Sequence, residues 1–404
     1  MSEIIRKNKK NFQNFFANNI FMFNSTECYC EIDKKTEYPG DKPKQIFKAY
    51  SKPNTQIHFA FEAKNGLVKL NEDGSISSKN ILGKLLAIKS NKLENYFDFF
   101  EKYGFILPTS EEKFTEINSD ILLSIINRLH ATLELLSTIT DISRTSYEKI
   151  VRLIHYLTFN KGIKVSYNKN QLNFIEYSNN YYNIFVKAKE LFIPNRSKER
   201  FDKGTYSFID YVNEEPIEID SNFIDDIIKD NDISSKYSDN NFRNITFIYA
   251  TSRENIDDVS LLINDFFFNY YLNVGIISKT SLTKTTYLND EYNKNNFNDK
   301  LKEKAIIIAK ILIKNEIDNN LFGITPTYNI EKMQPTWNID SLLSALYFGL
   351  FYMNPKMEIY RQCASPKCNE YFLVPVTSRK KIYCCKKCQN REMQKTYRAK
   401  KMNM

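Results

Sequence analysis

Four cysteines near the end of the chain constrain its fold more than any other feature. They form two close pairs with the spacing C-x4-C-x15-C-x3-C, at Cys363, Cys368, Cys384 and Cys388. Each pair makes a local turn that directs two thiolates at one ion, and the span between the pairs brings them together, as tetrahedral zinc requires. Four thiolates leave no coordination position open for water. The spacing therefore predicts one structural Zn²⁺ ion rather than a catalytic one.

The distribution of the cysteines favours metal over disulfides. Five of the seven lie in the last 42 residues of the 404-residue chain. No secretory signal is recognisable at the N-terminus, and the most apolar window, Leu342 to Met353, is far shorter than the ~20 residues needed to span a bilayer. We therefore expect a cytoplasmic protein with no membrane partner, in which clustered thiols bind metal.

The residues around the cysteine pairs predict a small treble-clef-like finger. Tyr371 and Phe372 follow the first pair on an expected strand, where one ring can cover the core that zinc nucleates. Ile382 and Tyr383 suit a return strand, and the second pair opens a helix from about residue 386.

The excess positive charge of the chain is confined to the same region. From Arg379 to Lys401 there are ten basic residues and one acidic residue, Glu392, which gives +9 and equals the net charge of the whole chain. Like charges three or four residues apart destabilise an isolated helix, which favours a negatively charged partner. We expect a nucleic acid, with DNA preferred. The expected contacts are Lys386, Lys387, Arg391, Lys395 and Arg398, of which the last four form one helical stripe. Met393 and Tyr397 are expected to pack inward.

The segment from Arg361 to Arg398 resembles the CGNR-type zinc finger found at the C-terminus of bacterial regulator-like proteins. The matching residues are Cys363, Cys368, Phe372, Arg379, Tyr383-Cys384-Cys385 and Cys388-Gln389-Asn390-Arg391. The resemblance implies a DNA-binding regulator. The chain departs from the pattern because Gln389 replaces Gly, Cys385 replaces Ser, and the second pair is spaced by three residues where the family usually has four. Cys385 is therefore an alternative to Cys384 as a ligand, since C-x2-C is an equally good zinc spacing.

The remainder of the chain is similar to uncharacterised proteins of low-GC Gram-positive bacteria, through the stretches FFEKYGFILP and SLLSALYFGLFYM, and this similarity implies no activity. We expect an α+β protein, predominantly helical, that ends in the zinc finger. Composition divides it into a mixed strand and loop part (1–90), a helical domain (91–193), an acidic surface segment or linker (194–241), an α/β-to-helical domain (242–355) and the finger with its basic helix (356–404).

Local patterns predict individual elements. Strands are expected at QIHFAFEA, GLVKL and NITFIYA, and core-facing helices at 119–139, 146–159, 254–272 and 299–317. Gly104 is expected to stop a helix that starts near residue 91. A loop around Pro326 and Pro335 should precede a last core helix, with Asp340 or Asn338 as its N-cap.

No catalytic motif is present in the sequence. There is no P-loop, nucleophile elbow or dinucleotide fingerprint. Cys28 and Cys30 are expected to be ordinary thiols, and His58, His130 and His155 to be satisfied by hydrogen bonds rather than to form a site.

Three functions are compatible with these features. The first is a DNA-binding regulator that grips phosphates through its finger and gains useful specificity by forming a homodimer. The second is an adaptor in which zinc only folds a protein-docking end. The third, an enzyme that acts on nucleic acid, would need an N-terminal site that the sequence does not reveal. In addition, the stretch from Asp210 to Asp239, with a net charge of −8, is hypothesised to fold over the finger and mask it.

Overall fold

The computed structural model describes residues 21–36, 43–62, 65–88, 92–109, 114–141, 146–168, 171–191, 205–209, 216–220, 239–251, 256–330, 333–354, 358–368, 370–378 and 380–402. Helix accounts for 49% of the structure and strand for 26%, so the chain mixes both, as the sequence predicts. Of the acidic stretch, only Pro216–Asp220 and the residues from Asp239 onward are described, so the masking hypothesis falls on residues outside the described part.

The chain forms two compact units, and neither is continuous in sequence. Unit 1 comprises Met1–Thr140, Ile163–Ile175 and Lys314–Met404. Unit 2 comprises Asp141–Gly162 and Glu176–Ile313. The cysteine pairs therefore belong to the same unit as the N-terminal part of the chain.

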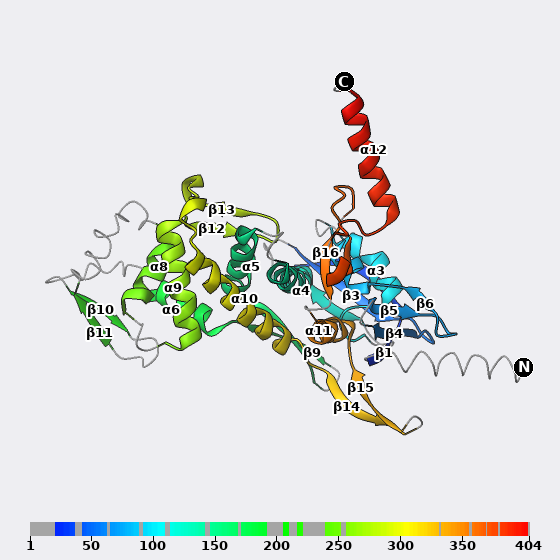
Figure 1. Ribbon diagram of the computed structural model, residues 1–404. Helices are drawn as coiled ribbons and strands as arrows, with labels where there is room; N and C mark the ends of the chain where they lie inside the picture. The colour runs from blue at the N-terminus through cyan, green and yellow to red at the C-terminus, as the bar shows by residue number, and fades with distance from the viewer. Residues whose placement is uncertain are drawn as a thin grey trace, which may run out of the picture. The chain divides into compact units, whose positions relative to one another are not determined.

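Unit 1 contains two antiparallel sheets from the N-terminal part (Figure 1). One has the order β1-β4-β5-β6, formed by β1 (Phe21–Ser25), β4 (Ile57–Glu62), β5 (Gly66–Leu70) and β6 (Ile76–Ser78). The other has the order β2-β3-β7, formed by β2 (Cys28–Lys35), β3 (Lys44–Ser51) and β7 (Thr115–Asn118). The strands expected at QIHFAFEA and GLVKL are confirmed, and Gly66 adopts the left-handed backbone (φ 67°) that the turn between them requires.

In unit 1, α2 (Ile81–Leu86) and α11 (Leu342–Tyr352) contact β5, α3 (Phe97–Tyr103) contacts β2, and α4 (Ser119–Thr140) contacts β3 and β7. The 3-10 turn η1 (Leu93–Tyr96) directly precedes α3. Gly104 ends α3 with φ 82°, as predicted. The expected N-caps of α11 are wrong, because the hydroxyl of Ser341 accepts the hydrogen bond from the Ser344 N–H at 3.1 Å.

The expected loop around Pro326 and Pro335 is also wrong. Both prolines lie in an antiparallel hairpin of β14 (Ile324–Asn329) and β15 (Gln334–Ile339), where Pro326 faces Trp337. A two-stranded sheet tolerates proline because each strand has a free edge, at which a missing N–H breaks no ladder.

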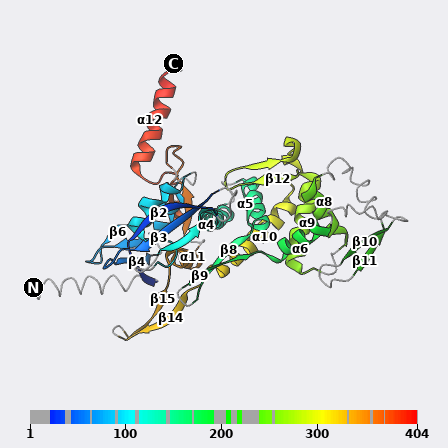
Figure 2. The same ribbon diagram turned by 180° about the vertical axis from the view of Figure 1, so that it is seen from behind.

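Unit 2 is mainly helical, with α5 (Tyr147–Phe159), α6 (Asn180–Leu191), α8 (Asn240–Thr251), α9 (Asp258–Asn273) and most of α10 (Asp299–Asn319). Figure 2 shows α6, α8 and α9 side by side. Its short pieces are the hairpin β12 (Ile277–Thr280) and β13 (Thr285–Tyr287), the hairpin β10 (Thr205–Ile209) and β11 (Pro216–Asp220), and the 3-10 turns η3 (Leu288–Asp290) and η4 (Lys294–Asn296). A further hairpin, β8 (Gly162–Asn168) and β9 (Gln171–Tyr177), includes residues of both units.

The strand expected at NITFIYA is wrong, because these residues form part of α8. The carboxylate of Asp239 accepts hydrogen bonds from the N–H groups of Asn241 and Phe242, both at 2.9 Å, and so caps a helix. Tyr249 stacks on Phe268 of α9 with ring centroids 3.9 Å apart. A short run of aromatic and β-branched residues fits strand and helix equally well, and here the cap and the packing against α9 select the helix.

The histidines are satisfied by hydrogen bonds, as predicted. His155 is buried in unit 2, where its Nδ1 lies 2.9 Å from Thr280 Oγ1 and its Nε2 lies 3.2 Å from the Tyr271 hydroxyl. His58 pairs with the Asn24 side chain at 2.9 Å.

Candidate metal centre

The first cysteine pair lies at the end of a hairpin in unit 1. β16 (Glu358–Gln362) and β17 (Tyr371–Pro375) pair antiparallel, with Arg361 opposite Phe372. Cys363 directly follows β16, and its N–H donates to the Glu370 carbonyl at 2.9 Å. The Cys368 N–H donates to the Ser365 carbonyl at 2.8 Å, which turns the chain so that both sulfurs face the same side.

The second pair lies where the last helix begins. α12 runs over Lys386–Met402, so the predicted helix is confirmed, and it places Cys388 in its first turn. The Ala364 N–H donates to the Ile382 carbonyl at 2.9 Å and draws the second pair beside the first. The expected return strand at Ile382 and Tyr383 is wrong, because the partner of β17 is β16, which precedes the cysteines.

The four sulfurs have the spacing that one tetrahedral ion requires. The Sγ atoms of Cys363, Cys368, Cys384 and Cys388 all lie within 4.8 Å of one another. The distance from Cys384 Sγ is 3.7 Å to Cys368 Sγ and 3.6 Å to Cys388 Sγ. Zn–S bonds of about 2.3 Å in tetrahedral geometry place sulfurs about 3.8 Å apart. These residues therefore fit a metal ion with four thiolate ligands.

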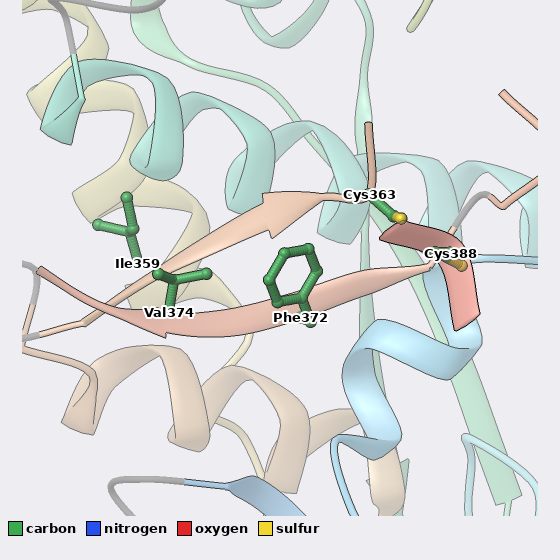
Figure 3. Packing of buried hydrophobic residues seen from close by; sticks show 5 residues of the cluster. All are labelled: Ile359, Cys363, Phe372, Val374 and Cys388. Atoms are coloured by element: carbon green, nitrogen blue, oxygen red, sulfur yellow. The ribbon is translucent and has the colours of Figure 1, made fainter. Parts of the chain in front are cut away.

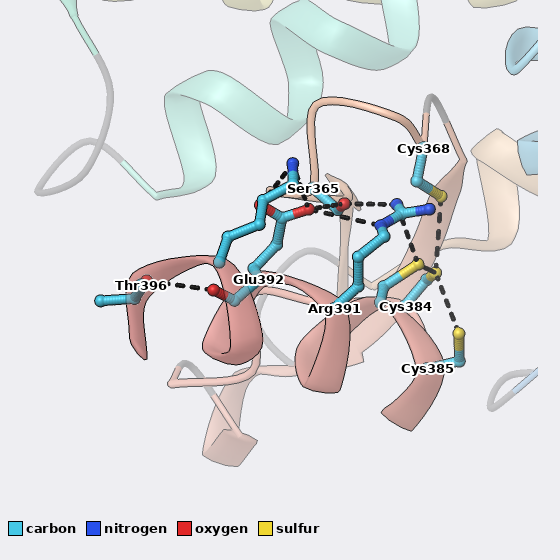
Figure 4. A network of polar contacts seen from close by, with 9 residues as sticks. Ser365, Cys368, Cys384, Cys385, Arg391, Glu392 and Thr396 are labelled. Atoms are coloured by element: carbon cyan, nitrogen blue, oxygen red, sulfur yellow. Dashed lines mark hydrogen bonds and ion pairs between the residues drawn. The ribbon is translucent and has the colours of Figure 1, made fainter. Parts of the chain in front are cut away.

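Cys385 does not join this cluster. Its side chain is exposed, and its sulfur lies 3.7 Å from that of Cys384 but outside the group of four (Figure 4). Of the two alternatives that the sequence leaves open, the geometry therefore brings Cys384 to the centre.

Burial and neighbouring groups shift the pKa values of the cysteine thiols at the centre. Desolvation, together with neighbouring sulfurs, raises the pKa of Cys384 far above its ordinary value and that of Cys388 to about 12. Desolvation is the largest single effect on Cys363 and acts to raise its pKa, but hydrogen bonds from the N–H groups of Cys384 and Ser365 and from the Cys384 and Cys368 thiols together outweigh it and lower the pKa. An ion that binds here displaces protons from buried thiols.

A small apolar core supports the sulfurs. Ile359, Phe372 and Val374 are buried together with Cys363 and Cys388, and Figure 3 shows the two cysteines at one end of the hairpin. The Lys381 ammonium lies 5.4 Å from the centroid of the Phe372 ring. Phe372 is thus the ring that covers the centre, as one of the two aromatic residues was predicted to do.

A polar network connects the loop of the first pair to the helix of the second. The hydroxyl of Ser365, which is fully buried, donates to Glu392 Oε1 at 2.5 Å. The Arg391 guanidinium donates to the Ser365 hydroxyl and lies 3.4 Å from Glu392 Oε1, while Lys395 lies 3.3 Å from Glu392 Oε2 (Figure 4). The hydrogen bond from Ser365, with smaller effects of Lys395 and Arg391, lowers the pKa of Glu392. Sequence reasoning missed Ser365 and Glu392, although Glu392 stood out as the single acidic residue in a basic segment.

The hairpin is also fixed to the helices of unit 1. The hydroxyl of Tyr371 donates to the Glu134 carboxylate and lies 2.8 Å from His130 Nε2, and both partners are on α4. The side-chain amide of Asn80, at the start of α2, donates to the Tyr371 carbonyl. Tyr371 therefore faces α4, whereas its neighbour Phe372 faces the metal centre.

The five basic residues of α12 that were expected to contact nucleic acid divide into two groups. Lys386, Lys387, Lys395 and Arg398 are exposed. The Arg391 side chain is only 33% exposed, because it folds back onto Ser365 and Glu392. The expectation that Met393 and Tyr397 pack inward is wrong, since they are 61% and 69% exposed. Arg379, which the resemblance includes, lies outside the described residues.

No protein-family model, curated protein or solved structure matches this chain. Within the described residues, none of the helices combines the length and the apolar character that crossing a membrane demands.

Proposed function

We propose that this chain is a zinc-binding, DNA-binding regulator that uses its C-terminal finger to hold the phosphate backbone. One observation carries the proposal: a helix that starts inside a four-cysteine centre displays an exposed surface rich in Lys and Arg. The side chains proposed to contact phosphate are Lys386, Lys387, Lys395 and Arg398. We assign Arg391, expected from the sequence to contact phosphate, to the support of the metal centre because of its contact with Ser365.

The ligand set supports zinc as the metal. Four thiolates in tetrahedral spacing suit Zn²⁺ or iron and do not suit the hard cations Mg²⁺ and Ca²⁺, which prefer oxygen. Metal analysis of the purified chain should find one zinc ion per chain. Cys363→Ser and Cys388→Ser should abolish it, and zinc content unchanged in both variants would remove the metal centre from the account.

The order of the elements supports a treble-clef type of finger. Two ligands come from the loop of the β16–β17 hairpin, and the other two come from Cys384, two residues before α12, and from Cys388 in its first turn. This order, together with the sequence resemblance, supports the relationship to CGNR-type fingers. The ion then has a structural role, because it fixes the direction in which α12 leaves the hairpin.

A salt titration tests the proposal. Each lost phosphate contact should reduce the slope of log affinity against log salt by about 0.9. The triple variant Lys387→Ala, Lys395→Ala, Arg398→Ala should therefore bind duplex DNA more weakly and with a shallower slope than the wild-type chain. The matched control carries alanine at three exposed lysines of unit 2, Lys279, Lys300 and Lys310. Equal binding by the wild type and the α12 variant would contradict the proposal.

One finger contacts few phosphates, so binding by a single copy should be weak. We propose that two copies of the chain bind together, because two helices double the number of contacts and add the specificity of a paired site. A stoichiometry of one chain per short duplex at saturation would contradict this part of the proposal.

A protein-docking adaptor is the second candidate, and the exposure of Met393 and Tyr397 favours it. Apolar side chains on an exposed helix are common where a protein partner packs. The salt titration separates the two functions. For an adaptor, alanine at Lys387, Lys395 and Arg398 should leave the affinity for duplex DNA unchanged, whereas for a DNA-binding regulator it should lower that affinity.

A further inference from the structure

The exposed surface of α12 has a line of side chains that is uncharged from Asn390 to Tyr397 and ends at Lys401. Glu392 and Cys388 face the metal centre, four residues apart. Asn390, Gln394, Tyr397 and Lys401 recur at steps of four, three and four residues, so they form a separate stripe, and all four are exposed. Lys387 and Arg398 lie along one side of this stripe and Lys386 along the other.

The side-chain amides in this stripe are available to a ligand. Among the described residues, neither Asn390 nor Gln394 has a side-chain hydrogen-bond partner, whereas Arg391 and Lys395 each pair with Glu392 beside the metal centre. An amide offers a donor and an acceptor side by side, which matches N6 and N7 of adenine in the major groove. Lys and Arg around it supply phosphate contacts, which carry no sequence information.

The exposed Tyr397 ring fits the same surface. Tyr397 lies in the stripe one turn beyond Gln394 and is 69% exposed. Apolar side chains in the major groove contact the thymine methyl group, which stands beside adenine in every A·T pair. A function in the groove thus explains why this ring does not pack inward.

The dimensions of the α12 helix can be compared with the grooves of duplex DNA and duplex RNA. An α-helix of about 10–12 Å diameter enters the major groove of B-DNA, which is about 12 Å wide. The major groove of A-form RNA is too deep and narrow for side chains to read. The arrangement therefore favours duplex DNA over duplex RNA.

We propose that α12 lies in the DNA major groove and that Asn390 and Gln394 each read an adenine, an inference that rests on the proposed DNA-binding function. Four helical residues rise about 6 Å, which is about two base-pair steps. The two adenines are thus adjacent or one step further apart. Each bidentate contact discriminates between bases by about fivefold to over a hundredfold.

Selection from a randomised DNA duplex pool tests the inference with the full zinc-loaded chain. The wild-type chain should enrich sequences that share two adenine positions. Asn390→Ala should lose the preference at one position and Gln394→Ala at the other, each by about tenfold, with an unchanged salt slope. Gln389→Ala is the matched control, because Gln389 is an exposed amide outside the stripe, and this variant should keep both positions.

The possible outcomes separate the inference from the function on which it rests. If DNA is retained without any enriched sequence, base reading is overturned and the DNA-binding function stands. Enrichment that survives in Asn390→Ala and Gln394→Ala also overturns base reading. Duplex RNA bound as tightly as duplex DNA overturns the assignment to the major groove. If no nucleic acid is retained, both the inference and the function fail.

Discussion

Ser365 and Glu392 join the two halves of the metal centre through a hydrogen bond of 2.5 Å from the serine hydroxyl to the carboxylate. Ser365 belongs to the loop of the first cysteine pair and Glu392 to the helix that carries Cys388. The contact therefore acts together with the proposed ion, and both orient α12 relative to the hairpin.

Replacing Glu392 should weaken metal binding without removing a ligand. In Glu392→Ala the buried Ser365 hydroxyl and the Arg391 guanidinium lose their shared acceptor, and groups that orient metal ligands typically contribute about tenfold or more to affinity. Competition with a chromophoric chelator measures the loss. Met393→Ala, the next residue along and exposed, is the control. Equal zinc affinity in the two variants would show that the network has no role in the centre.

Two single substitutions can show whether Cys384 or Cys385 is the third metal ligand. Cys384→Ser should lose zinc, because the Cys384 sulfur lies 3.6 Å from that of Cys388 within the cluster. Cys385→Ser should retain one ion per chain, since its sulfur lies outside the group of four. Metal analysis after dialysis reads the result, and the reverse pattern would show that Cys385 is the ligand.

Removing the Tyr371 hydroxyl should destabilise unit 1. In Tyr371→Phe the Glu134 carboxylate, 8% exposed, loses a donor, and His130 loses a partner at 2.8 Å. Loss of a hydrogen bond to a buried charged group costs about 1–3 kcal/mol in the free energy of unfolding. Denaturant unfolding measures this, with Tyr328→Phe as the control because Tyr328 is 55% exposed. If Tyr371→Phe lowered the free energy of unfolding no more than Tyr328→Phe does, the hydrogen bond from Tyr371 to Glu134 would not stabilise unit 1.

The stability of unit 2 should fall in acid because of His155. Burial lowers the pKa of His155 to about 3, from an ordinary value of 6.5. Below pH 6.5, His155 therefore binds a proton in the unfolded chain, whereas in the folded chain it binds one only near pH 3. Stability falls through this window by up to about 1.4 kcal/mol per pH unit.

Hydrogen exchange in α5 and β12, followed from pH 7 to pH 5, measures the effect of His155. His155→Gln should be less stable at pH 7 but should show a flatter dependence on pH, because glutamine does not titrate. Parallel pH profiles for the wild type and the variant would rule out His155 as the cause.

The local parts of the fold could be predicted from the sequence, and the long-range parts could not. Cysteine spacing identifies Cys363, Cys368 and Cys388, because each pair is set by a single turn of chain. Helical periodicity identifies α4, whose predicted face includes the fully buried Leu122, Leu129 and Leu133. The contact between Tyr371 and Glu134 joins residues 237 positions apart, and no local pattern encodes such a pairing.

The wrong prediction that Met393 and Tyr397 pack inward has a physical cause. Met393 and Tyr397 have the spacing of a buried pair, but Figure 4 shows that the inner side of α12 is occupied by the polar network of Arg391 and Glu392. The side chains that face the hairpin are therefore charged, and the apolar pair is exposed. Residue spacing predicts that two side chains share a face but not which face packs against the fold.

The most direct test of the account is DNA binding by the same chain with and without zinc, measured over a range of salt concentrations. The zinc-loaded chain should bind duplex DNA with an affinity that falls as salt rises, and removal of the metal should abolish this binding because α12 loses its attachment to the hairpin. Restoring zinc should restore it. Binding that is absent from the loaded chain, or equal with and without metal, would contradict the central claim.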